Sequence, residues 1–81
     1  MERQMQFIGY HIDGYDTDKT IPVSTGATRE EAQSKAIQRI LSLAIMDGSI
    51  AVQERPELSA EDFETLTKHL DDWFASKGVT V

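Results

Sequence analysis

The strongest constraint on the fold is an amphipathic helix in the C-terminal third of the sequence. Ser59 is a good N-cap, and the acids after it, Glu61 and Asp62, complement the helix dipole. The large apolar side chains that follow fall within about 100° of one another on a helix. They are Phe63, Leu66, Leu70, Trp73 and Phe74. Lys77-Gly78 ends the pattern, so we expect a helix that packs one apolar face against the rest of the protein.

An earlier helix has a broader apolar surface. Thr28 is placed to cap it, and Glu31 follows three residues later, as in a capping box. We expect this helix to end at Asp47-Gly48, because glycine suits the left-handed position after a helix. Its polar wedge includes Lys35 and Arg39, which we expect on a solvated helix face.

The apolar residues of this earlier helix spread over roughly 220°, more than one packing contact needs. We therefore expect the helix to contact the sheet and, in addition, either the second helix or another subunit. The residues that would form the additional contact are Ile37, Leu41 and Ile45.

Three segments have the alternation or β-branched content of strands: residues 4–12, Thr20–Thr25 and Ser49–Gln53. Pro22 lacks an N–H and belongs at a sheet edge or a bulge. The order β-β-α-β-α predicts an α+β fold, a small antiparallel sheet of about three strands covered on one face by two helices. Residues 1–81 are expected to form a single domain. The sequence leaves open whether Val79–Val81 is a strand or a docked tail.

Composition restricts the function. The chain has no cysteine, which excludes disulfides, thiolate zinc sites and cysteine catalysis and favours a cytoplasmic location. The net charge of −6 opposes direct binding to nucleic acid or to anionic membranes. No apolar segment reaches the roughly 20 residues of a membrane span. Most of the excess negative charge falls between Glu54 and Asp72.

No motif predicts chemistry. Asp13, Asp16 and Asp18 lie in one loop, but an EF-hand counted from Asp16 would need a glycine and a glutamate where the chain has Ile21 and Ala27. His11 and His69 would have to meet carboxylates through folding to form a zinc site or an active site. We expect no catalytic residue, no metal and no cofactor.

The stretch Ser24-Thr25-Gly26-Ala27-Thr28-Arg29-Glu30-Glu31-Ala32, followed by Ala36, resembles the strand-to-helix junction of HicB-type antitoxins, where Gly-x-Thr-x-Glu-Glu-Ala ends the sheet. Double-stranded RNA-binding domains have a related turn before their last helix. The chain lacks the third strand that HicB-type proteins have before the helix, and it lacks a DNA-binding extension. It also lacks the basic helix start of RNA-binding domains. The resemblance implies an antitoxin-like role and assigns no functional residue.

The resulting expectation is a small, acidic, non-catalytic protein that binds or regulates another macromolecule, as an inhibitor or antitoxin does. A protein partner could be recognised by the acidic face of the second helix, namely Glu57, Glu61, Glu64 and Asp71. One alternative is a homodimeric scaffolding subunit joined through the surplus apolar arc. Another is a small enzyme or ligand carrier with His11 or His69 in a pocket.

Overall fold

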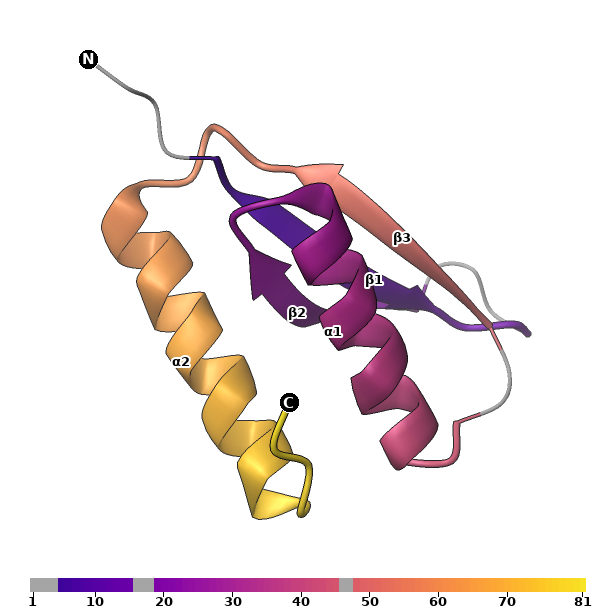
Figure 1. The fold of residues 1–81 in the computed structure, drawn as a ribbon. Coiled ribbons are helices and arrows are strands. Elements are labelled where there is room, and N and C mark those ends of the chain that lie inside the picture. The colour runs from indigo at the N-terminus through magenta and orange to yellow at the C-terminus, as the bar shows by residue number, and fades with distance from the viewer. Residues whose placement is uncertain (1–4, 16–18, 46–47) are drawn as a thin grey trace.

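The computed structural model describes residues 5–15, 19–45 and 48–81. Within these ranges the chain forms β1 (Phe7–Ile12), β2 (Thr20–Gly26), α1 (Arg29–Ser42), β3 (Ser49–Glu54) and α2 (Ala60–Ser76) (Figure 1). The predicted α+β class, the three strands and the β-β-α-β-α order are confirmed.

The three strands form one antiparallel sheet in the order β2-β1-β3, so that β2 and β3 are its two edges. The pairing of β1 with β3 runs without interruption from Phe7 opposite Glu54 to Ile12 opposite Ser49. The pairing of β1 with β2 shifts register between Gly9 and Tyr10. Pro22 lies on the edge strand beside this bulge, where its missing N–H removes no ladder hydrogen bond inside the sheet.

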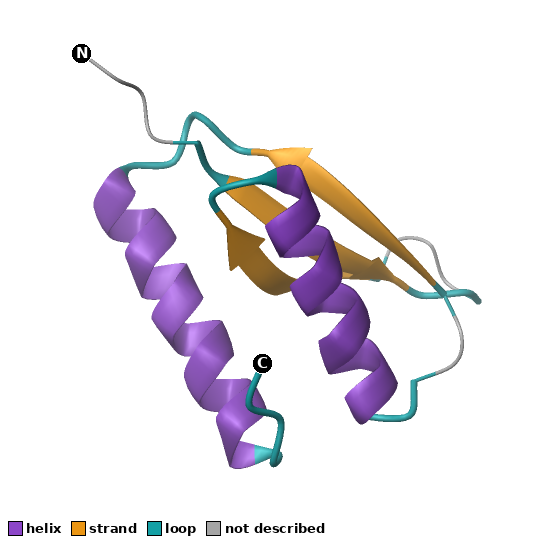
Figure 2. Cartoon of the chain, in the orientation of Figure 1, coloured by secondary structure: helices purple, strands orange, loops and turns teal. Residues whose placement is uncertain are grey.

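Helix α1 lies across the sheet and contacts all three strands (Figure 2). The helix approaches the sheet closely because the residues at the contact are small. Ala32 and Ala36 are both fully buried there, at 0 % exposure. Ser24 of β2 donates a hydrogen bond of 2.6 Å from its hydroxyl to the Ala32 carbonyl oxygen. A Cβ on Gly9 would lie 2.2 Å from the Ser24 Oγ and 3.0 Å from the Ala36 Cβ. The spacing between α1 and the sheet therefore requires glycine at position 9.

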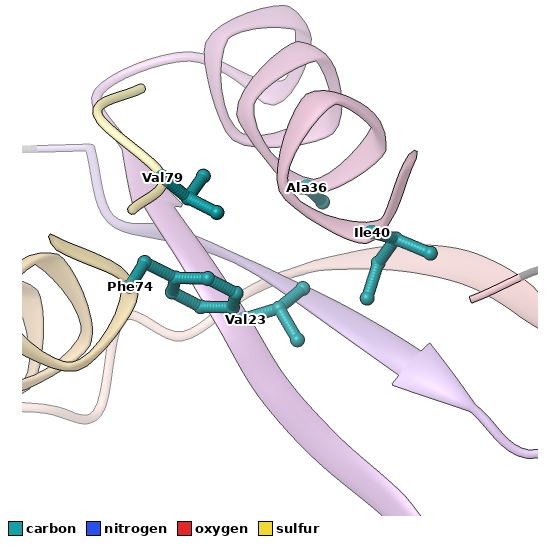
Figure 3. Packing of buried hydrophobic residues seen from close by; sticks show 5 residues of the cluster. All are labelled: Val23, Ala36, Ile40, Phe74 and Val79. Carbon is teal, nitrogen blue, oxygen red and sulfur yellow. The ribbon is translucent and has the colours of Figure 1, made fainter. Parts of the chain in front are cut away.

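Helix α2 packs along the β2 side, on the opposite flank from β3 (Figure 1). The main core cluster lies between the two helices and the sheet. Its side chains come from β2, α1, α2 and the segment after α2 (Figure 3), and they are Val23, Ala36, Ile40, Phe74 and Val79. The last residues of the chain are thus a docked tail and form no strand, which resolves the alternative that the sequence left open for Val79–Val81.

Both helices begin at their predicted caps. The Thr28 hydroxyl accepts a hydrogen bond from the Glu31 N–H, and the Ser59 hydroxyl accepts one from the Asp62 N–H, each at 3.0 Å. Glu31 also reaches back to the Ala27 N–H at 3.2 Å, one residue before the cap. These bonds satisfy N–H groups that have no partner within the helix.

The end of α1 differs from the prediction, because the helix stops at Ser42 instead of continuing to Asp47-Gly48. Ala44 adopts the left-handed conformation with φ of 59°. Its N–H donates to the Leu41 carbonyl, and the Ile45 N–H donates to the Ile40 carbonyl, which is the Schellman pattern. A non-glycine residue thus ends the helix, so a prediction based on glycine places the end of the helix too late in the sequence. Ile45 lies just beyond the helix, and Asp47 lies outside the described residues.

The two helices end in the same hydrogen-bond pattern, but the residue in the left-handed position differs. Exchanging alanine and glycine at these two positions is therefore expected to have opposite effects on stability. Gly78 occupies the left-handed position after α2 with φ of 83°, and no atom would touch a Cβ placed there. Replacing Ala44 with glycine removes a backbone strain, so we expect an increase of about 0.5–1 kcal/mol in the free energy of unfolding. Replacing Gly78 with alanine introduces the same strain, and we expect a loss of about 1 kcal/mol.

Urea unfolding of the two single variants and of the double variant checks this prediction. The two ends are far apart in sequence and share no hydrogen bond, so the two effects are expected to add. A loss of stability in Ala44→Gly would contradict the assignment of left-handed strain at this position.

Candidate interaction surfaces

Arg39 is buried, contrary to the prediction from the sequence. Predicted on a solvated helix face, it is 1 % exposed and is among the most deeply buried side chains. Its guanidinium donates to the Val23 carbonyl oxygen at 2.8 Å and, from Nε and Nη2, to the main-chain oxygen of Val81 at 3.0 and 2.7 Å. It also lies over the Phe74 ring, 4.7 Å from its centre. Arg39 therefore ties α1 to β2, to α2 and to the docked tail.

The same guanidinium pairs with Asp71 of α2 at 2.5 Å. Asp71 was predicted to belong to an acidic binding face, and its side chain is 48 % exposed. Its carboxylate nevertheless forms an ion pair within the fold, so it is only partly available to a binding partner. A signal for this was present in the sequence, because Arg39 is three residues after Ala36 and seven after Ala32, on the same side of α1 as these buried alanines.

The predicted acidic face is only partly available for binding, and Glu57 lies in the turn before α2 and is not on the helix. Glu57 is exposed and pairs with Arg55, which also donates a 2.6 Å hydrogen bond to the Tyr10 hydroxyl. The hydrogen bond from Arg55 lowers the pKa of the Glu57 carboxyl below its ordinary value, and the bond to Glu57 raises the pKa of Arg55. Glu61 and Glu64 are exposed, and no ion pair joins them to another described residue.

The surplus apolar arc of α1 remains largely uncovered. Ile37 is 40 % exposed, Leu41 is 61 % exposed and Ile45 is 37 % exposed. We call these three residues the apolar row. Ile37 and Leu41 are four residues apart and share one side of α1, and Ile45 follows at the helix end. Of the two additional contacts that the sequence allowed, α2 does not cover this row within the described chain.

The surroundings of the apolar row carry little charge. The other exposed residues on the outer side of α1 are mostly uncharged, and they are Gln33, Ser34, Gln38 and Ser42. Glu30 lies at the first turn of the helix, where it complements the helix dipole. An uncharged surface with exposed isoleucine and leucine is typical of the centre of a protein interface.

A second apolar surface is a groove of about 260 Å³ between β2 and α2. Ile21, 56 % exposed, and Trp73, 45 % exposed, stand at this groove, and the Lys77 ammonium lies 5.4 Å from the centre of the Trp73 ring. His69 also lines it. The sequence analysis placed Trp73 on a buried helix face, but half of this side chain is solvent-exposed because α2 packs mainly with Phe63, Leu70 and Phe74.

The residues considered for chemistry form no metal-binding group in the part of the chain that the structure describes. In residues 5–15, 19–45 and 48–81, no group of three or more histidine or acidic side chains is placed to hold a metal ion. His11 is a buried strand residue beside Gly48, and His69 lies on α2. The Ser24 hydroxyl is buried and donates to a helix carbonyl. Asp16 and Asp18 of the acidic loop lie outside the described residues.

No helix in the described parts of the chain is long and apolar enough to cross a membrane. No protein-family model, no curated protein and no solved structure matches this chain.

Proposed function

We propose that this domain is a small, non-catalytic interaction protein that binds another protein through the apolar row of α1. The observation that supports the proposal is the exposure of Ile37, Leu41 and Ile45 in a chain whose core is small. Leaving such side chains in water forgoes about 25 cal/mol for each Å² of apolar surface, and contact with a partner would recover this free energy.

The charge distribution supports a protein partner over a nucleic acid. The net charge is −6, and the acids concentrate on α2 and the segment before it, while the apolar row is almost free of charge. Phosphate contacts need lysine and arginine, and here Arg39 is buried and Arg29 and Arg55 make hydrogen bonds within the fold. The absence of cysteine accords with a cytoplasmic setting, which we include in the proposal.

Affinity capture of the tagged protein from its native host, with quantitative mass spectrometry, tests the proposal. We expect the double variant Ile37→Gln/Leu41→Gln to lose at least 90 % of a specifically captured protein, because it removes the apolar contact. Ile21→Gln is the matched control, since Ile21 is equally an exposed isoleucine but lies in the groove beside α2. Its capture is expected to equal that of the wild type.

A third variant tests the acidic face. Glu61→Lys/Glu64→Lys reverses the two acids that have no ion pair among the described residues. If this variant alone loses the partner, the acidic face binds and the apolar row does not. Capture unaffected by the Ile37→Gln/Leu41→Gln change would refute the proposal.

A further inference from the structure

The two edges of the sheet are protected to very different degrees. At the β2 edge, Pro22 and a bulge interrupt the strand, and α2 packs alongside. These are devices that prevent edge-to-edge pairing. The β3 edge has neither a proline nor a bulge, and its sequence, Ser-Ile-Ala-Val-Gln-Glu, carries one charge, at its last residue. One outward carbonyl of this edge, that of Val52, accepts a hydrogen bond from Arg29 of α1. In the described chain no further strand or helix lies beyond it (Figure 2).

The hydrogen-bond pattern identifies which main-chain groups face outward on β3. The Arg55 N–H donates to the Gln6 carbonyl at 2.8 Å, immediately before the first register pair, Phe7 with Glu54. Because hydrogen-bonded and non-hydrogen-bonded pairs alternate in an antiparallel ladder, Gln53 and Ala51 bond to β1. The main-chain groups of the residues between them point away from the sheet, and these residues are Ile50, Val52 and Glu54.

The β3 edge and the apolar row belong to the same side of the molecule. Arg29 of α1 donates from Nη1 to the Val52 carbonyl at 2.9 Å, which links the start of the helix to the middle of β3. Ile50 and Val52 are half-buried beneath α1. A strand added at β3 would extend the sheet under the outer side of α1, where Ile37 and Leu41 are exposed.

We propose that the occupant of this edge is the β3 strand of a second copy of the chain, paired antiparallel about a two-fold axis. Three strands from each copy would form one continuous sheet, with the two apolar rows facing each other above it. This inference rests on the proposed function, because it identifies the partner of the apolar row.

Two physical reasons favour a second copy. An exposed strand edge is complementary to another exposed edge, and within the described chain β3 is the edge that no proline, bulge or neighbouring helix interrupts. Electrostatics adds a constraint, because two copies with a net charge of −6 repel each other over most of their surface. The charged residues on the β3 and α1 side include Arg29, Glu30 and Glu54, and antiparallel pairing keeps the two Glu54 carboxylates apart at opposite ends.

The interface would be small. A strand of six residues is about 20 Å long, and one helix side adds a limited apolar area, so the contact falls at the low end of protein interfaces. We therefore expect a reversible dimer that forms at micromolar to millimolar concentration. Because screening reduces the repulsion between two acidic copies, dimerisation is expected to strengthen from 20 to 500 mM NaCl.

Sedimentation equilibrium of the purified protein, from about 5 μM to 1 mM, measures this association. Amide hydrogen exchange by NMR locates it. In a β3-to-β3 dimer the amides of Ile50, Val52 and Glu54 gain protection as the concentration rises. Those of Ala51 and Gln53 are protected at every concentration, because they bond to β1. A contact between copies that leaves the β3 edge free does not produce this alternating pattern.

Two variants separate the edge from the apolar row. Val52→Pro removes one outward N–H but keeps the carbonyl that Arg29 binds, so we expect a folded monomer. Val52→Thr, which keeps the N–H and the branched shape, is its control and is expected to dimerise within threefold of the wild type. Leu41→Glu places two acids opposite each other and is expected to weaken the dimer at least tenfold. Circular dichroism checks that each variant is folded.

A protein that is monomeric up to 1 mM at 500 mM NaCl overturns this inference. So does a dimer in which the alternate β3 amides gain no protection and Val52→Pro has no effect. The proposed function is judged separately, by the capture experiment with Ile37→Gln/Leu41→Gln. A monomer whose partner capture depends on the apolar row would refute the dimer and leave the proposed function intact.

Discussion

Replacing Arg39 with methionine is expected to lower the free energy of unfolding by about 3 kcal/mol. Methionine matches much of the buried stem but donates no hydrogen bond, so the oxygens of Val23 and Val81 lose their partner. The contact with the Phe74 ring is lost as well. For a domain of this size, roughly 4–12 kcal/mol holds the whole fold together.

Lys35→Met is the matched control on the same helix. Lys35 is partly exposed and forms an i,i+4 pair of 3.9 Å with Glu31, so its replacement is expected to change stability by less than about 0.5 kcal/mol. Urea unfolding at pH 7 measures both variants. Equal effects of the two substitutions would show that Arg39 is not the central tie between the helices. Asp71→Asn is expected to cost less than Arg39→Met, because Asp71 is half-exposed and its loss leaves two main-chain acceptors bound.

Gly9→Ala is expected to destabilise the protein by about 2–3 kcal/mol. The added Cβ would lie 2.2 Å from the Ser24 Oγ, 3.0 Å from the Ala36 Cβ and 3.1 Å from the Ala32 carbonyl oxygen. Two of these three neighbours belong to the helix, so α1 must move away from the sheet to make room. Ser24 would also lose its hydrogen bond to Ala32.

A double-mutant cycle with Ser24→Ala isolates the cause. Ser24→Ala alone is expected to cost about 1 kcal/mol, because it removes one buried hydrogen bond. In the double variant the closest clash is gone, so the combined loss is expected to be smaller than the sum of the single losses by about 1 kcal/mol. Additive losses would contradict a direct collision between positions 9 and 24.

Local patterns in the sequence were sufficient to predict the helices and strands of this fold. Thr28 and Ser59 cap the helices as predicted, and Pro22 lies beside a bulge on an edge strand as predicted. The two caps act through hydrogen bonds to near neighbours in the chain, and Pro22 acts through its missing N–H, so these effects are readable from the local sequence.

The interior interactions were not predictable in the same way. Arginine is a residue type usually found on the surface. The hydrogen-bond partners of Arg39 lie far from it in the sequence, in β2, α2 and the tail. The end of α1 was misplaced because Ala44 takes a conformation for which glycine is the usual signal. Of the predicted binding residues, Ile37, Leu41 and Ile45 are exposed together, whereas Asp71 and Glu57 have partners within the fold.

The docked tail also determines when the protein can fold during synthesis. Val79 belongs to the main core cluster, and Arg39 binds the main-chain oxygen of Val81, 42 residues further along the chain. On the ribosome, the sheet and α1 emerge before these residues exist, so the guanidinium initially has no tail to bind. The core can therefore close completely only after the tail has left the ribosome, so the last step of folding follows the synthesis of α2 and the tail.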